Sequence, residues 1–243
     1  MEQKQSNGPS LFSGARHNWK FALKFMVFSV VFWLIQFGYQ FFALTPGEME
    51  NALIRSFAFS GATFFGLALL SSALFKWKPQ FAKYWTIRRS LGVMGFVFTF
   101  LHVSTATQFL FQGNPANWFL SLNPFENPVI FGVIAYPIFA LLALTSTDWA
   151  VFKLKTKWKT IHRLVYLAYW GAVFHFATIN PPALMNPAGY LLISITILAL
   201  LGELYWFFKT IQQKRAGTLA IAIGIFIILL YLITAYLKWF SAA

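Results

Sequence analysis

Three stretches of this chain, 56–75, 127–147 and 216–237, contain no charged side chain. Each is long enough to cross the hydrocarbon core of a bilayer, because a spanning helix needs roughly 20 mostly apolar residues. Two longer uncharged stretches, 90–125 and 164–202, contain Asn–Pro pairs that break helices and introduce turns. The pattern therefore predicts an all-α fold built from membrane-spanning helices.

The composition indicates that lipid is part of the solvent of this chain. Of its 243 residues, 58% are hydrophobic and only 10% are charged, whereas a soluble domain carries about 25% charged residues. We expect a polytopic bundle of seven helices, with an N-terminal segment at 1–20, six spans at 21–210, and a basic loop and a seventh helix at 211–243. The expected spans are 22–45, 53–75, 90–112, 127–147, 161–180, 187–209 and 216–237.

The distribution of charge argues against nucleic acid as the partner, despite a formal net charge of +13. The basic residues form clusters that all fall on one face of the expected bundle, as in loops retained on the cytoplasmic side. These clusters lie at 4–24, 76–89, 153–163 and 209–215. The other face keeps Arg55 and Lys238 and carries the acidic Glu48, Glu50 and Glu126. We therefore expect the N-terminus in the cytoplasm and the C-terminus outside.

Three of the four histidines, His102, His162 and His175, lie inside expected spans, where an ionisable side chain is costly and points to function. The fourth, His17, lies in the basic N-terminal segment and is interpreted as a solvated side chain. Counted from the cytoplasmic face, His102 and His175 lie roughly 18 and 21 Å along their helices. Two imidazoles at similar depth are what a bis-histidine haem iron needs.

The residues leave open whether a second haem binds nearer the cytoplasmic face. His162 lies about 20 Å from His175 along the helix axis, but about 140° away from it around an ideal helix, so that a kink or π-bulge would have to realign the two rings. The matching position on the third helix holds Arg88 instead of a histidine. Arg88 and Arg89 are either topology-setting charges or contacts for a haem propionate or a flavin phosphate.

Other polar and small residues inside the spans have two interpretations each. Glu203 is expected to pair with Lys209 or Arg163, or to serve in proton or quinone handling. Gly95 and Gly171 lie close in sequence to the histidines, where they either leave room for a porphyrin edge or allow ordinary helix packing.

Two motifs carry a resemblance to a known family. Arg88-Arg89-Ser90-Leu91-Gly92, followed by Phe100-Leu101-His102, resembles the third helix of the ferric-reductase-like transmembrane family. Within that family, three segments with His175 after them are similar to the MsrQ (YedZ) branch: Thr145-Ser146-Thr147-Asp148, Lys157-Trp158-Lys159 and Ile161-His162-Arg163-Leu164-Val165-Tyr166-Leu167. The match covers roughly residues 50–210. The seventh span departs from the six-helix core of the family.

The resemblance implies a haem b subunit of the bacterial inner membrane, with FMN as a further cofactor. His102, His162 and His175 would be the haem-associated histidines. Electrons would enter on the cytoplasmic side, from a flavin reductase or the quinone pool. They would leave to a periplasmic molybdopterin enzyme of the MsrP type, which reduces methionine sulfoxide in proteins. No substrate chemistry is expected in this chain itself.

Two alternatives stand beside this interpretation. The first is a direct reductase of ferric iron or oxygen at the outer face, which would need an exposed outer haem edge. The second is a small proton-coupled transporter in which the histidines relay protons, although inverted repeats and broken midplane helices are not evident in the sequence. A haem spectrum separates the transporter from the two redox hypotheses.

Overall fold

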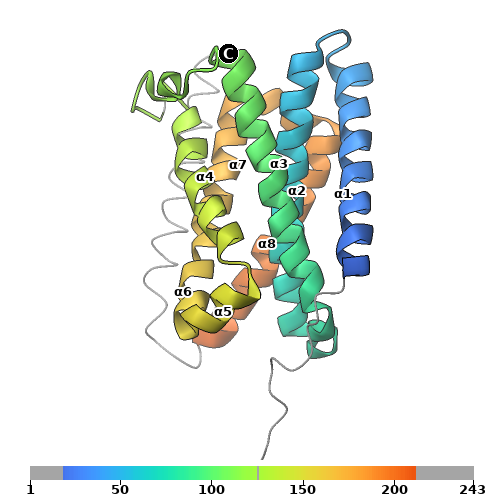
Figure 1. Cartoon of the computed structure of the whole chain (residues 1–243), viewed down its shortest axis with the longest axis vertical. Coiled ribbons are helices and arrows are strands. Elements are labelled where there is room, and N and C mark those ends of the chain that lie inside the picture. Colours follow the sequence, from blue (N-terminus) through green and yellow to red (C-terminus); the bar gives the residue numbers. More distant parts are fainter. Residues whose placement is uncertain (1–18, 125, 212–243) are drawn as a thin grey trace, which may run out of the picture.

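The computed structural model describes residues 19–124 and 126–211, and this part of the chain is a helix bundle without strands (Figure 1). The all-α polytopic fold predicted from the sequence is thereby confirmed. Six helices form the body of the bundle, and short helical turns connect them. The long elements are α1 (Trp19–Tyr39), α2 (Met49–Trp77), α3 (Trp85–Leu110), α4 (Val129–Leu144), α7 (Leu164–Ile179) and α8 (Pro187–Ile211). The short ones are η1 (Gln40–Leu44), η2 (Pro79–Tyr84), η3 (Pro115–Phe119), α5 (Asp148–Leu154), α6 (Thr156–His162) and η4 (Pro181–Met185).

Each of the first six expected spans corresponds to one of these long helices, whereas the seventh lies outside the described residues. Among the described residues, four helices are long and apolar enough to cross a membrane by themselves, namely α1 with η1, α2, α3 and α8. A fifth span results if α4 is counted together with α5, although the two meet at an angle of 94°. Helices α4 and α7 have 16 residues each, which corresponds to about 24 Å.

The fifth expected span, 161–180, differs from the structure at its start. The chain forms α6 up to His162, makes a turn at Arg163, and begins α7 at Leu164. Basic residues occupy the segment before the turn and the apolar run begins after it, so that α6 lies at the end of the bundle while α7 enters its interior. The interruption falls between His162 and His175, which are therefore on different helices.

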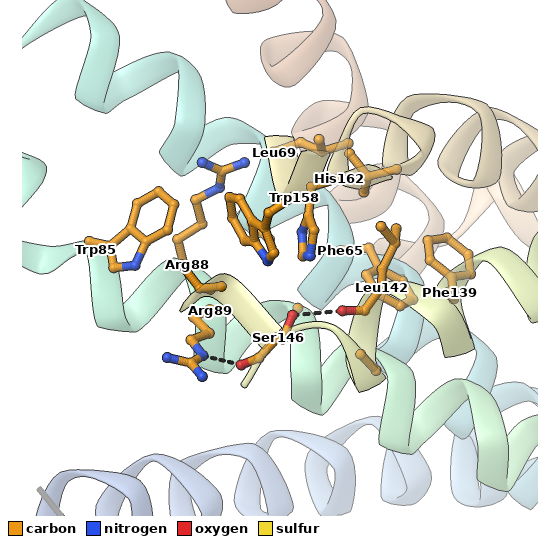
Figure 2. A pocket seen from close by; sticks show the side chains of 15 residues that line it. Phe65, Leu69, Trp85, Arg88, Arg89, Phe139, Leu142, Ser146, Trp158 and His162 are labelled. Atoms are coloured by element: carbon orange, nitrogen blue, oxygen red, sulfur yellow. Dashed lines mark hydrogen bonds between the residues drawn. The ribbon is translucent and has the colours of Figure 1, made fainter. Parts of the chain in front are cut away.

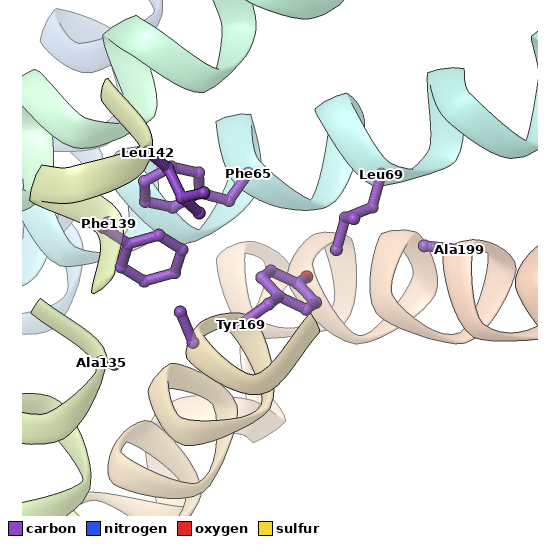
Figure 3. Close-up of a cluster of buried hydrophobic side chains, with 8 residues drawn as sticks. Phe65, Leu69, Ala135, Phe139, Leu142, Tyr169 and Ala199 are labelled. Carbon is purple, nitrogen blue, oxygen red and sulfur yellow. The ribbon is translucent and has the colours of Figure 1, made fainter. Parts of the chain in front are cut away.

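Helix α2 is the centre of the bundle and packs along α1, α3 and α8, while α4 packs along α7. Its small residues permit these close approaches: a Cβ on Gly61 would meet Thr99 of α3 at 2.7 Å, and one on Gly66 would meet the hydroxyl of Tyr169 at 2.6 Å. The main hydrophobic cluster joins α2, α4, α7 and α8 (Figure 3). Within it, the rings of Phe65 and Phe139 stack with centroids 3.8 Å apart.

The two ends of the bundle differ in character (Figure 1). Helices α5 and α6 lie at one end and carry the lysine cluster of 153–159, so we call it the basic end. The connections that contain η3 and the α1–α2 turn lie at the other end. Helix α5 begins where the Thr147 side chain accepts a hydrogen bond from the amide of Ala150 at 3.2 Å, a normal N-cap.

Candidate functional site

His102 and His175 meet in the half of the bundle away from the basic end. His102 lies in the last third of α3, and His175 lies one turn before the end of α7. Their ring centroids are 6.3 Å apart, with the ring planes at 68°. An iron that bonds one nitrogen of each ring at roughly 2 Å needs ring centres about 6 Å apart, since each centre lies about 1 Å behind its nitrogen. The spacing of the two rings therefore fits axial ligation of one haem iron.

A backbone carbonyl holds the Nδ1 atom of each ring. Nδ1 of His102 lies 3.0 Å from the carbonyl oxygen of Ile54 in α2, and Nδ1 of His175 lies 3.1 Å from that of Pro128, just before α4. A carbonyl can only accept, so each Nδ1 carries the proton and each Nε2 keeps its lone pair. Histidines that bind metals characteristically donate their second N–H in this way, because the contact sets both tautomer and ring orientation.

Gly132 of α4 makes the close approach to His175 possible. A Cβ at this position would lie 3.1 Å from Nδ1 of His175 and 3.2 Å from its Cε1. Those separations are shorter than ordinary van der Waals contacts. The glycine therefore allows α4 to pack directly against the imidazole whose Nδ1 contacts Pro128.

The second candidate site is a pocket at the basic end (Figure 2). Its empty volume is about 730 Å³, including the part open to the surroundings. Helices α2 to α7 all contribute to it, mostly with apolar and aromatic side chains. The polar and aromatic residues that matter for binding are Trp85, Arg88, Arg89, Ser146, Trp158 and His162.

His162 lies in this pocket, held between an indole and a hydroxyl. Its ring stacks on Trp158 with centroids 3.9 Å apart, and its Nε2 lies 3.1 Å from Oγ1 of Thr145. The indole N–H of Trp158 donates to the carbonyl of Thr145 at 2.9 Å. Thr145 therefore orients both rings, and His162 occupies a site distinct from that of His102 and His175.

The two neighbouring arginines have different surroundings. Arg89 forms an ion pair with Asp148 and donates from Nε to the carbonyl of Ser146, so it ties α3 to the α4–α5 turn. Arg88 instead lies over the ring of Trp85, with 5.2 Å from the guanidinium carbon to the ring centroid, and lines the pocket (Figure 2). Of the two, Arg88 is the one positioned to bind an anionic group of a ligand.

The structure brings together some of the residues singled out from the sequence and reassigns others. Glu203 pairs with Lys76 of α2 at 2.8 Å, so the expected pairing with Lys209 or Arg163 is wrong. Lys76 lies far away in sequence, and only the packing of α8 on α2 brings it close. Gly171 approaches the carbonyl of Phe131 and Gly95 approaches the ring of Phe65, which assigns both glycines to helix packing instead of clearance for a porphyrin.

Several groups at the two sites were not anticipated from the sequence. They are the carbonyls of Ile54 and Pro128, Gly132, and the contact of the Thr145 hydroxyl with His162. A main-chain carbonyl carries no residue-type signal, so the first two could not have been identified. Gly132 has a weak signal, a small residue within an apolar span, but many such glycines merely pack helices. Thr145 belongs to one of the family motifs, which does not indicate the group it contacts.

Residues 55–173 match the family described as "Ferric reductase like transmembrane component". This part of the chain, which contains both histidines of the first site and the whole lining of the second, is therefore similar to the ferric-reductase-like transmembrane family.

The chain is also similar to curated proteins named "Protein-methionine-sulfoxide reductase heme-binding subunit MsrQ". Relatives from Brucella ovis, Brucella canis and Brucella melitensis are each 34% identical to it over 92 residues. The aligned part is 37% of this chain and 40% of each relative, so it spans about two fifths of their length. The resemblance to the MsrQ branch drawn from the sequence motifs is thereby confirmed.

Proposed function

We propose that this chain is a haem b subunit that carries electrons across the membrane, with His102 and His175 as the residues that would hold the haem iron. The observation that carries the proposal is the opposition of the two rings at 6.3 Å, each with its Nδ1 on a backbone carbonyl. The match to the ferric-reductase-like family and the similarity to proteins named as haem-binding subunits support it.

A bound haem would supply reversible one-electron chemistry at its iron. The protein's own residues would set the conditions for that chemistry. The carbonyls of Ile54 and Pro128 hold the proton of each imidazole on Nδ1, leave the lone pair of Nε2 free to bind iron, and raise the basicity of the two rings as ligands. Gly132 allows α4 to pack directly against the His175 ring, and this packing holds the ring in place.

We assign the pocket at the basic end to electron entry. Its aromatic walls and the guanidinium of Arg88 suit a flat, anionic cofactor, which is either a second haem with His162 as one ligand or FMN. Nε2 of His162 contacts Thr145, so ligation by this nitrogen would require the Thr145 hydroxyl to turn away. The interruption of the helix at Arg163 removes the 140° constraint that an unbroken helix would impose on His162 and His175.

The direction of electron transfer is inferred from the distribution of basic residues between the two ends of the bundle. Loops rich in lysine and arginine stay on the cytoplasmic side of the inner membrane, so the basic end is assigned to the cytoplasm. Electrons would then enter there, from a flavin reductase or a quinol, and leave near His175. The acceptor would be a periplasmic molybdopterin enzyme of the MsrP type. The chain itself performs no substrate chemistry in this scheme.

The test is a reduced-minus-oxidised visible spectrum of the detergent-purified protein, with His102→Ala and His175→Ala measured beside it. The wild type should show the sharp α band of a b-type haem, and each variant should lose the band of this site. His17→Ala is the matched control, since that histidine lies before the first span, and it should leave the spectrum unchanged. A wild type without haem after expression with adequate haem supply would refute the proposal.

A further inference from the structure

Helix α5 lies across the basic end of the bundle, at an angle of 94° to α4 (Figure 1). One of its faces packs on the bundle, where Ala150 is buried and Val151 lines the pocket at the basic end. At about 100° per residue, Trp149, Phe152 and Lys153 share the opposite face. Trp149 is 68% exposed and Phe152 is 79% exposed, and Nζ of Lys153 lies 4.8 Å from the centroid of the Trp149 ring. Helix α5 therefore presents two large apolar rings away from the protein.

The contacts of α5 set its depth in the membrane. Its first residue, Asp148, pairs with Arg89, which lies four residues after Trp85, the first residue of α3. At 1.5 Å per residue, α5 therefore lies about 6 Å short of the end of α3. Helix α4 has 16 residues and spans only about 24 Å, whereas the hydrocarbon core is about 30 Å thick. At the other end of α4, the exposed Glu126 has to stay among the lipid headgroups. Helix α5 therefore lies near the boundary between acyl chains and headgroups.

The charge beside these rings is positive and has no counter-charge from the protein. Four exposed lysines occupy alternate positions of 153–159. In the part of the chain that the structure describes, none of them forms an ion pair. The two acidic residues of this end are already paired, Asp148 with Arg89 and Glu203 with Lys76. The lysines of 153–159 are therefore available to an anionic partner.

The junction between α5 and α6 places one of these lysines in a strained conformation. Lys155 has φ of 49° and ψ of −122°, which side chains with a Cβ adopt only at a cost. Its amide donates to the carbonyl of Val151 at 3.1 Å, and its carbonyl accepts from the amide of Trp158 at 3.3 Å. Glycine would take this conformation without strain. A lysine here adds an ammonium group to the cluster in spite of that cost, which fits a role for its charge.

We propose that Trp149, Phe152 and the lysines of 153–159 form a surface that binds anionic phospholipids of the leaflet at the basic end. The two rings pack among the acyl chains, and the lysines bind the phosphate groups. Interfacial helices with aromatic and basic side chains bind anionic membranes in this way. An acidic soluble protein would match the charge equally well. It would, however, meet the connection between α2 and α3 before it reached α5, which lies deeper.

Lipid bound on this surface would have a consequence inside the protein. Val151 of α5, together with Trp158 and His162 of α6, lines the pocket at the basic end. A lipid held on the outside of the two helices restrains them, and with them the wall of that pocket. Anionic lipid should therefore raise the thermal midpoint of the protein, because a ligand that binds the folded state stabilises it.

The first experiment asks whether the rings face lipid or water. The chain has no cysteine, so Phe152→Cys provides a unique site for a spin label on the full-length protein in nanodiscs of phosphatidylglycerol and phosphatidylcholine. The label should collide with oxygen, which concentrates in lipid, more than with a neutral water-soluble nickel complex. Ile35→Cys, at a side chain 66% exposed on α1, is the lipid-facing control. Gln80→Cys, exposed in η2, is the water-facing control. A label at 152 that behaves like the label at 80 would indicate a surface for a soluble partner and overturn the proposal.

The second experiment measures lipid selectivity by native mass spectrometry of the full-length protein. The wild type should bind phosphatidylglycerol more tightly than phosphatidylcholine. Lys153→Gln combined with Lys157→Gln should weaken phosphatidylglycerol binding roughly 25-fold, since each lysine near an anionic surface contributes about fivefold. Lys153→Arg combined with Lys157→Arg keeps both charges and should bind as the wild type does. Lys24→Gln combined with Lys78→Gln removes the same charge from α1 and from the end of α2, and should also retain binding.

Three results would overturn the inference. The first is equal binding of the two lipids by the wild type. The second is an equal loss of binding in the glutamine variant at 153 and 157 and in the control at 24 and 78, since it would show a diffuse attraction to the whole basic end. The third is a thermal midpoint of the wild type that phosphatidylglycerol does not raise. None of these measurements needs bound haem, so their outcome is independent of the proposed function.

Discussion

Substitution of Gly132 by alanine tests the proposed haem site without touching a ligand. The added Cβ would lie 3.1, 3.2 and 3.3 Å from Nδ1, Cε1 and Cγ of His175. Ordinary contacts of this kind lie at about 3.5–4.0 Å, so the ring has to recede by about 0.4 Å. Nδ1 already lies 3.1 Å from the Pro128 carbonyl, and a similar increase would bring that hydrogen bond to about 3.5 Å, the limit of a useful one.

The expected consequence is weaker haem binding and a changed reduction potential. Loss of a partner that orients a metal-binding histidine costs about 10–100-fold in affinity, so we expect that range for Gly132→Ala. The assay is haem content per polypeptide, followed by a redox titration of the haem that is retained. Gly38→Ala is the matched control, because it also lies in a helix and a Cβ there meets nothing within 4 Å.

A Gly132→Ala protein with full haem content and an unchanged midpoint potential would refute the reasoning. It would mean that the His175 ring does not depend on the approach of α4, and hence that the described ring position is not the one used for ligation. A loss of haem in Gly38→Ala as well would point to a general sensitivity of the bundle to alanine.

Two further predictions concern the core and the pocket at the basic end. Phe139→Ala removes a buried ring stacked on Phe65 and should destabilise the protein by about 3–5 kcal/mol, measured as a lower thermal midpoint in detergent. Phe42→Ala, at a ring that is 77% exposed, should leave the midpoint nearly unchanged. Equal shifts of the midpoint in the two variants would contradict the assigned core. Thr145→Val removes the hydroxyl beside Nε2 of His162. It should alter the spectrum of any cofactor in the pocket at the basic end and leave the spectrum of the His102–His175 site intact. A spectral change confined to the His102–His175 site would show that the two sites are wrongly assigned.

Sequence and structure agree best on features that depend only on the order of residues along the chain. The stretches 56–75 and 127–147 are long, uncharged and apolar; the first lies within α2, and the second contains α4. Span length is a local property, since every backbone polar group inside lipid has to be satisfied within its own helix. The similar depth of His102 and His175 could also be anticipated, because depth along a helix follows from residue count alone.

The sequence by itself also determined the charge asymmetry and the family motifs. From these features a haem subunit is inferred before any fold is known. The tertiary structure decided which groups surround each histidine and which helix faces meet. The ion pair of Glu203 with Lys76, the carbonyls of Ile54 and Pro128, and the close contact of Gly132 with His175 all join segments far apart in sequence. Such contacts depend on how each helix is rotated against its neighbours, and rotation follows from the packing of the whole bundle, which hydrophobicity along a single segment does not encode.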